Sequence, residues 1–422
     1  MTHKILRRGA AALVAVTLLA ACDDTPDVVK PKPVAGGDLF RSYVALGNSI
    51  TAGFQSGGIN DSTQRESYAV LLAQQAGLEL GRTFTYPAFA APGCPAPATQ
   101  TLQLNPPQSC GLRNVALETS VLNNVAVPNA FAWDLTRNNT PTAPSNPLQT
   151  FILGGRTQIR RALEAQPTFA SVWIGNNDVL AAASVGVLTP VAGASPGLIP
   201  ADTVIKYIRV TIDTLKQAPT LKGGVLIGPV DVPNAPRFFA GSALFTALGT
   251  PSQLQADIVA ATGQTVTVFP NCINSPSLIS SIVVERIKAG SYPPYIACDT
   301  TGVPPTLTAP PALVGELFVL SALEQAAISA QVAKVNAYAR AKADSAGFAY
   351  FDPNNATNGL AALRAAGAIP AVPSFTDPKN PYGTYISFDG IHPRRPAHVA
   401  MANALIDVIN AKYKTTIPKI GG

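Results

Sequence analysis

Four short apolar runs divide the chain, and each is bounded by glycine or by turn-forming residues. They cover residues 43–47, 169–175, 224–228 and 348–351. An unbroken apolar run of this length is typical of a strand that is covered on both faces in a parallel sheet. The runs therefore predict four buried, parallel strands.

Segments with helical periodicity lie between and after these runs. Apolar residues from Val204 to Leu215 share one helical face, residues 316–346 are rich in alanine, and residues 395–413 carry Pro396 near their start. These features predict helices, since apolar spacing of 3–4 residues buries one face and proline is tolerated in the first turn. The alternation predicts an α/β protein with a parallel sheet and helices on both faces.

Two long stretches, near residues 87–148 and 229–311, interrupt this alternation. Both are rich in Pro, Asn, Ser and Thr. We interpret them as insertions over the strand ends, where α/β proteins bind ligands, within one domain of residues 41–414. Hydrophobic residues make up 47% of the chain and charged residues only 13%, against about 25% in soluble domains, so a large core is available and global disorder is excluded.

The first 21 residues have a basic start and an apolar run, which predicts a removable signal peptide that is too short to span a membrane. The run ends in Leu19-Ala20-Ala21-Cys22, which resembles the bacterial lipobox. That resemblance implies lipid attachment at Cys22, a flexible tether over residues 22–40, and a place in a bacterial cell envelope on the periplasmic or extracellular side of a membrane.

The net charge argues against nucleic acid as a partner. It is +6 for the whole chain and +3 without the three cations of the signal segment, and no cluster of Lys and Arg follows. Nothing in the sequence indicates the oligomeric state.

Four cysteines remain after Cys22, an even number in an exported chain, so two disulfides are expected. Three connectivities exist. We favour Cys94–Cys110 with Cys272–Cys298, since each closes a short proline-rich loop. A zinc site is the weaker alternative, because no C-x-x-C spacing is present.

Three motifs carry candidate chemistry. The first strand runs into Gly47-Asn48-Ser49, which places a serine at the carboxyl end of a buried strand. The second run ends in Gly175-Asn176-Asn177-Asp178, where an amide could bind an oxyanion. In Asp389-Gly390-Ile391-His392, two intervening residues allow the carboxylate to orient the imidazole.

Together, in this order, the motifs resemble those of the SGNH (GDSL-type) hydrolase family across most of the mature chain. The resemblance implies the SGNH hydrolase fold, which is a three-layer, flavodoxin-like α/β fold. It implies Ser49 as nucleophile, His392 as base and Asp389 as the acid that orients it. It also implies that Asn177 donates to the oxyanion together with the N–H of Ser49.

Two positions depart from the family pattern. Asn48 stands where the family usually has Asp. The family also has a glycine whose N–H completes the oxyanion hole, and two residues are candidates for that role. Asn129 is favoured, because Asn tolerates a left-handed conformation and keeps its N–H; Gly93 is the alternative.

Gly193-Ala194-Ser195-Pro196-Gly197 matches the G-x-S-x-G pattern of α/β-hydrolases. Pro196 cannot donate the N–H that this motif requires after the serine, so we interpret Ser195 as a loop residue. His398 is expected to face solvent on the C-terminal helix, and neither a catalytic metal nor another cofactor is indicated.

The favoured function is a serine ester hydrolase of the esterase or lipase type, acting on a small-molecule, lipid or glycan ester. A carbohydrate O-acetyl esterase is the alternative within this class. A non-catalytic binding lipoprotein on the same fold is the alternative from another class; it predicts a lost catalytic residue, and none of the three is lost.

Overall fold

The computed structural model describes most of the chain after the predicted signal peptide. The described residues are 35–99, 110–113, 120–137, 146–192, 195–248, 256, 259–260, 263–308, 314–374, 377 and 379–421. Cys22 and the predicted signal peptide lie outside them. Among the helices of these residues, none is both long and apolar enough to cross a membrane.

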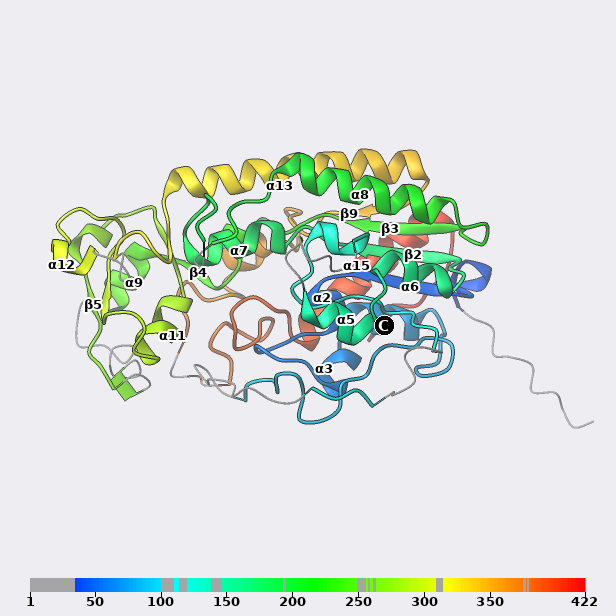
Figure 1. The fold of residues 1–422 in the computed structure, drawn as a ribbon, viewed down its shortest axis with the longest axis horizontal. Coiled ribbons are helices and arrows are strands. Elements are labelled where there is room, and N and C mark those ends of the chain that lie inside the picture. Colours follow the sequence, from blue (N-terminus) through cyan, green and yellow to red (C-terminus); the bar gives the residue numbers. More distant parts are fainter. Residues whose placement is uncertain are drawn as a thin grey trace, which may run out of the picture. The chain divides into compact units, whose positions relative to one another are not determined.

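The predicted sheet is present. Its strands are β1 (Tyr43–Gly47), β2 (Phe169–Trp173), β3 (Gly223–Ile227) and β9 (Ala349–Phe351), in the order β1-β2-β3-β9, and every pairing is parallel. The carboxyl ends of β1 and β2 meet in register, with Gly47 opposite Trp173. The loops that follow these two strands therefore start at the same end of the sheet. Figure 1 shows strands β2, β3 and β9 of this sheet side by side.

An irregular segment extends this sheet beyond β1. Val125 N donates to Ala45 O at 2.9 Å and Val127 N donates to Gly47 O at 3.2 Å, so residues 123–127 run alongside β1. This segment belongs to the first predicted insertion. Its end lies beside the end of β1.

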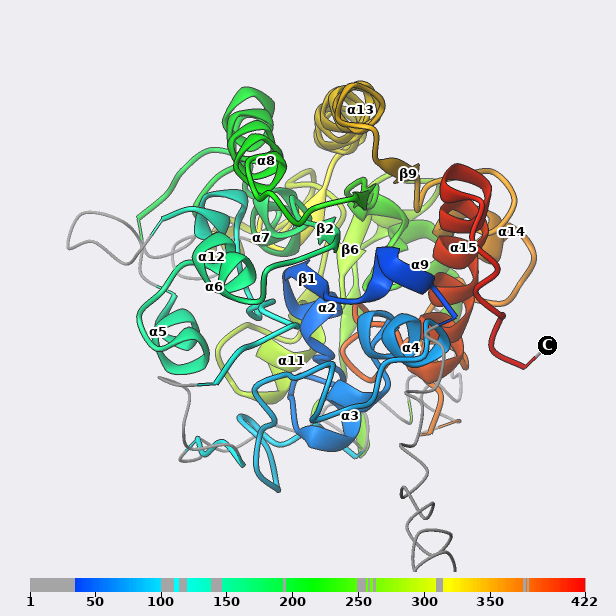
Figure 2. The ribbon, with the colours of Figure 1, turned by 90° about the vertical axis from the view of Figure 1, so that its right-hand side faces the viewer.

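Helices cover both faces of the sheet, as predicted (Figure 2). Alternate strand residues point to opposite faces: Val44 and Leu46 belong to one core, and Tyr43 and Ala45 to the other. The first face is covered by α6 (Gln158–Glu164), α8 (Ala201–Lys216) and α13 (Ala322–Ala346). The second is covered by α4 (Tyr68–Gln75) and α15 (Arg395–Tyr413). The α/β class is therefore confirmed.

The long alanine-rich helix begins later than its composition predicts. Residues 316–321 do not belong to α13, because Val319–Leu320 form strand β8. The Ser321 side chain accepts a hydrogen bond from Glu324 N, and the Glu324 carboxylate accepts one from Ser321 N; this capping box begins the helix at Ala322.

The end of the predicted tether is part of the folded structure. Gly37–Phe40 form the 3₁₀ turn η1, and the ring of Phe40 is buried and stacks on Phe169 with centroids 4.4 Å apart. Burial of an aromatic ring stabilises the folded state, so Phe40 belongs to the folded domain. The tether therefore ends before residue 40.

The second predicted insertion builds a small layer of its own. An antiparallel sheet pairs β4 (Phe238–Ala240), β6 (Leu278–Ser280) and β8 in the order β4-β6-β8. A separate apolar core lies beneath it. The remaining elements of this layer are β5 (Thr267–Val268), β7 (Tyr295–Ile296), α9 (Gly241–Leu248), α11 (Ile282–Lys288), α12 (Pro305–Thr308) and η4 (Pro270–Cys272).

Both favoured disulfides are present. Cys94 pairs with Cys110 and Cys272 with Cys298, with Cα atoms 5.1 and 5.0 Å apart. The second bond lies inside the core of the inserted layer. So short a segment buries little apolar surface, and the disulfide adds the stability that this small core lacks.

The other helical elements are short and lie near the strand ends. They are α2 (Ser49–Ala52), α3 (Asp61–Arg65), α5 (Pro147–Leu153), α7 (Asn177–Val185), α14 (Leu360–Ala365), η2 (Ala132–Leu135) and η3 (Val232–Asn234).

Candidate active site

Ser49 is the first residue of α2, directly after β1. The side chain of Asn48 caps this helix by accepting from Ile50 N at 3.2 Å. Gln158 fixes the turn from the other side, since its side chain accepts from Gly47 N and donates to Gly47 O, both at 2.9 Å. A Cβ atom at position 47 would lie 2.7 Å from Trp173 O, so this turn requires glycine. The nucleophile candidate therefore has a fixed backbone.

The three residues of the predicted triad come together from opposite ends of the chain. Ser49 Oγ lies 2.9 Å from His392 Nε2, and His392 Nδ1 lies 2.7 Å from Asp389 Oδ2. Phe54 packs against the imidazole with ring centroids 4.9 Å apart. This linear arrangement can move a proton from the serine hydroxyl to the imidazole while the carboxylate holds the ring.

Asp389 accepts more hydrogen bonds than the sequence suggests. Its Oδ2 also accepts from Gly57 N at 2.8 Å, and its Oδ1 accepts from Ser387 Oγ, Ile391 N and His392 N at 2.9–3.0 Å. Burial opposes the charge, but the attraction and hydrogen bonds of His392 and the charge of Arg237 outweigh it and hold the pKa of Asp389 well below its usual range. The residue is therefore an ionised acceptor with a fixed orientation.

The inserted layer contributes to the position of this carboxylate. Arg237, beside β4, donates from Nε and Nη2 to the carbonyl oxygen of Asp389 at 2.9 and 2.6 Å, and its own N–H donates to Gly390 O at 2.8 Å. Sequence reasoning missed Arg237, since no local signal links residues 152 positions apart. Ser387 was also missed, although its spacing from Asp389 is typical of a side-chain bond in a turn.

Asn177 and Asn129 lie on neighbouring segments. Asn177 begins α7, after β2, and its Nδ2 donates to Ala130 O at 2.9 Å. Asn129 has a φ of 60° in the turn that follows the segment beside β1, and this turn is closed by Ala130 N donating to Val127 O. The left-handed conformation expected for position 129 is therefore present.

Gly93, the alternative, lies in a different environment. Its φ is 132°, and a Cβ atom there would lie 2.5 Å from Ile59 O and 2.9 Å from Pro95 O. These contacts explain the glycine by close backbone packing. Position 129 remains favoured for the oxyanion donor, because the segment that leads into it runs alongside β1, the strand that precedes Ser49.

No protein-family model matches the chain, and no curated protein matches its sequence. The chain is similar to a GDSL-like lipase of known structure. That lipase, from Parabacteroides merdae, is 12% identical, with 88% of this chain and 96% of the lipase covered and a TM-score of 0.35.

Two further solved structures are similar at the same level. A variant of an acetyl-xylooligosaccharide esterase from a Geobacillus is 10% identical, with 90% of this chain and 96% of the esterase covered and a TM-score of 0.38. An extracellular lipase from Streptomyces rimosus is 15% identical, with 88% of this chain and 99% of the lipase covered and a TM-score of 0.33.

Asp178, next to Asn177, is a buried acid to which the sequence analysis assigned no role. Both of its oxygens accept from Ala132 N, at 3.1 and 3.3 Å. Burial raises the pKa of Asp178 to about 7, with a further contribution from Asp134. The side chain connects α7 to η2 and so holds the segment that follows the Asn129 turn.

Ser195 lies away from the triad in a local turn, as expected. Its hydroxyl donates to Val187 O at 2.6 Å and accepts from Gly197 N at 3.1 Å. Gly193 and Ala194 lie outside the described residues. With its hydroxyl engaged in backbone hydrogen bonds, Ser195 is a structural residue.

The expectation for His398 is wrong. The imidazole is fully buried, and Nδ1 accepts from Tyr68 N at 3.2 Å. Burial lowers the pKa of His398 to about 3, with a further contribution from His392. Helical periodicity predicts which residues of α15 share a face. It does not predict that α4 packs against that face and buries His398.

Proposed function

We propose that the chain is a serine ester hydrolase that acts on carboxylic esters through Ser49, His392 and Asp389. The observation that carries this proposal is the hydrogen-bonded series from Ser49 Oγ through the imidazole to the Asp389 carboxylate, with contacts of 2.9 and 2.7 Å. Because all three residues are present and aligned, a purely binding role would leave their geometry unexplained.

In the acylation half, Ser49 Oγ attacks the ester carbonyl carbon and its proton passes to His392 Nε2. Asp389 stabilises the imidazolium and keeps Nδ1 protonated. Collapse of the tetrahedral intermediate breaks the bond to the alcohol oxygen, which takes the proton from Nε2. The product is an acyl-Ser49 enzyme and a free alcohol.

In the deacylation half, water attacks the acyl carbon and His392 takes one of its protons. The proton then returns to Ser49 Oγ as the acid departs. In both halves the oxyanion needs donors. Ser49 N–H has no acceptor within α2, because it is the first residue of the helix. Asn177 Nδ2 has a second hydrogen beyond the one given to Ala130, and Asn129 N–H completes the proposed set.

We propose in addition that the mature chain is a lipoprotein attached to a membrane through Cys22. The support is the sequence before residue 35, with its basic start, apolar run and cysteine in a lipobox-like context. The hydrolase would then act at the cell envelope.

The nucleophile is tested by labelling and by substitution. We expect a p-nitrophenyl alkylphosphonate to form a phosphonate ester with Ser49, identified by mass spectrometry of the digested protein, with release of p-nitrophenol. Ser49→Ala should lower kcat on p-nitrophenyl esters by about 10³-fold or more, since triad removal leaves only binding and oxyanion stabilisation. Ser195→Ala is the matched control and should keep wild-type rates. Labelling of Ser195 in place of Ser49 would contradict the proposal.

A further inference from the structure

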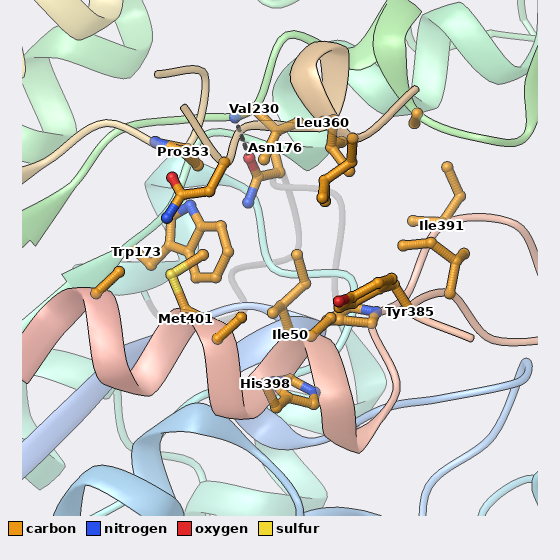
Figure 3. A pocket seen from close by; sticks show the side chains of 18 of the residues that line it. Ile50, Trp173, Asn176, Val230, Pro353, Leu360, Tyr385, Ile391, His398 and Met401 are labelled. Carbon is orange, nitrogen blue, oxygen red and sulfur yellow. Dashed lines mark hydrogen bonds between the residues drawn. The ribbon is translucent and has the colours of Figure 1, made fainter. Parts of the chain in front are cut away.

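A cavity of about 270 Å³ lies next to the candidate site, at the carboxyl ends of β2, β3 and β9 and against the start of α15 (Figure 3). Several of its lining residues are sequence neighbours of site residues. Ile50 follows Ser49, Asn176 precedes Asn177, and Ile391 and Pro393 flank His392. The cavity therefore lies beside the candidate site, although Ser49, Asn177 and His392 do not themselves line it.

The walls are mainly apolar and come from elements distant in the sequence. Trp173, Leu180, Phe351, Leu360 and Met401 line the cavity, from β2, α7, β9, α14 and α15 respectively. A concave apolar site of this kind favours a hydrocarbon group over a free sugar, whose hydroxyls would lose their hydrogen bonds to water.

Two buried polar groups interrupt this apolar lining. Asn176 Oδ1 accepts from Val230 N at 2.8 Å, so Nδ2 is the free end of the amide, and Figure 3 shows it pointing toward the interior of the cavity. His398 Nδ1 accepts from Tyr68 N, which assigns the proton of the neutral ring to Nε2. Among the described residues neither Asn176 Nδ2 nor His398 Nε2 has a hydrogen-bond partner.

Both of these groups are donors, and this determines what would complement them. A buried donor is costly without an acceptor, whereas an oxygen placed within reach removes that cost. A hydroxyl, keto or ether oxygen in the cavity can accept from Asn176 Nδ2, which points into it, whereas His398 is fully buried beneath α15. A plain hydrocarbon chain cannot accept a hydrogen bond.

We infer that this cavity binds the acyl group of the substrate, and that it selects chains of medium length that carry an oxygen acceptor along the chain. The inference rests on the proposed esterase function and names its substrate class. A cavity of about 150 Å³ holds benzene, so 270 Å³ has room for about ten carbon-sized groups, far more than an acetyl group needs.

The order of the chemical steps favours the acyl group over the alcohol as the occupant. The acyl group stays bonded to Ser49 through both halves of the reaction, whereas the alcohol must leave before water can attack. Binding energy from a chain in the cavity therefore acts in both transition states. An alcohol held there would block its own departure and the entry of water.

The first test varies chain length while the alcohol stays p-nitrophenol. We expect kcat/KM of the wild type to rise from acetyl to an optimum at about six to ten carbons, as the cavity volume implies. Met401→Trp places bulk in the cavity and should move the optimum to acetyl or butyryl. Met401→Leu keeps the volume nearly constant and should keep the optimum. An unchanged optimum in Met401→Trp would overturn the assignment of the acyl group to this cavity.

The second test compares octanoyl esters with analogues that have a keto or ether oxygen at successive positions. We expect at least one analogue to exceed the plain ester about tenfold or more in kcat/KM. Asn176→Asp keeps an oxygen that can accept from Val230 N but removes the donor, so it should abolish this preference. The ratio between two substrates within one variant is insensitive to a general loss of activity.

The outcomes separate the two proposals. If the wild type hydrolyses acetyl esters best, or prefers no oxygen-bearing chain, the esterase stands and the inference falls. The same holds if selectivity follows the alcohol instead of the acyl group. If no ester is hydrolysed and Ser49 is not labelled, the proposed function falls and the acyl site falls with it. Thermal unfolding of each variant confirms that the fold is retained.

Discussion

At the scale of the residue, the tautomer of His392 is the feature on which the chemistry depends. The Asp389 carboxylate can only accept hydrogen bonds when ionised, so it requires a proton on Nδ1 and leaves Nε2 free to accept from Ser49. Backbone N–H groups from Gly57, Ile391 and His392 hold the carboxylate in that orientation. The base is therefore set in its active tautomer before substrate binds.

The pH profile tests this base. We expect kcat/KM to fall as the pH is lowered from about 8 to 5, because His392 must be neutral to accept the Ser49 proton. His398, whose pKa is lowered to about 3, stays neutral throughout this range and cannot produce that limb. A flat profile between pH 5 and 8 would contradict a histidine base.

Substitution of the carboxylate tests the tautomer itself. In Asp389→Asn, the amide oxygen can still accept from the backbone, but the NH₂ group would face Nδ1 and favour the proton on Nε2. We expect kcat to fall by about 10³- to 10⁴-fold, as measured on p-nitrophenyl esters. Nearly unchanged rates would show that Asp389 does not orient the ring.

The two asparagines would supply different oxyanion donors: Asn177 its side-chain amide and Asn129 its backbone N–H. Asn177→Ala removes a side-chain donor and should lower kcat by about 10²- to 10³-fold with little change in KM, because the amide acts where charge develops in the transition state. Asn129→Gly keeps the N–H and reaches the same dihedral angles, so its rate should stay near wild type. A large loss in Asn129→Gly would return Gly93 to consideration.

At the scale of the element, buried polar side chains connect the short segments around the strand ends. Asp178 at the start of α7 accepts a hydrogen bond from the N–H at the start of η2. Its neighbour Asn177 donates one from Nδ2 to Ala130 O, in the turn before η2. Arg237 ties the edge of the inserted sheet to the Asp389-Gly390 turn. The loops of the site are thus held by contacts between elements, each made by one side chain.

The raised pKa of Asp178 makes one of these contacts sensitive to pH. Its folded pKa of about 7 lies above the unfolded value, so the unfolded chain loses this proton first as the pH rises. We expect the free energy of unfolding to decrease from about pH 4 to pH 7 through this group. Asp178→Asn, which can still accept from Ala132 N, should flatten that decrease in urea unfolding.

Asp344 provides the control for this measurement. It is exposed on α13, so Asp344→Asn should leave the slope of stability against pH unchanged. An Asp178→Asn variant with the wild-type slope would show that the buried carboxyl does not couple to unfolding in this range.

At the scale of the whole molecule, one parallel sheet gathers a site from both ends of the sequence. Ser49 follows the first strand, Asn177 the second, and Asp389 and His392 come just before the last helix. The inserted layer of residues 237–320 lies outside this frame but contacts the Asp389 turn through Arg237. An insertion with its own core can therefore support the site without supplying its reacting groups.

The proposed membrane attachment also belongs to this scale. Cys22→Ala should prevent lipidation and leave the chain unprocessed or released into the soluble fraction. Fractionation at high salt followed by mass spectrometry of the N-terminus measures this. A Cys22→Ala protein that remains wholly with the membranes would contradict attachment through this residue.

The sequence by itself determined the strands, the main helices and the nucleophile, base and acid candidates, because these depend on local order. A buried parallel strand needs an apolar run, and a residue just after it needs no long-range information to be placed at the sheet edge. The start of α13 also depends on a local feature, the Ser321 cap. The alanine-rich composition of the segment did not indicate this start.

Only the tertiary structure decided what lies against each surface. The burial of His398 depends on α4, the hold on Asp389 depends on Arg237 from the inserted layer, and the cavity depends on walls from β2, β9 and α15. The first two of these contacts join residues 330 and 152 positions apart in the chain. Periodicity gives the direction of a side chain within its own element, but the partner on the other side is determined by packing between elements.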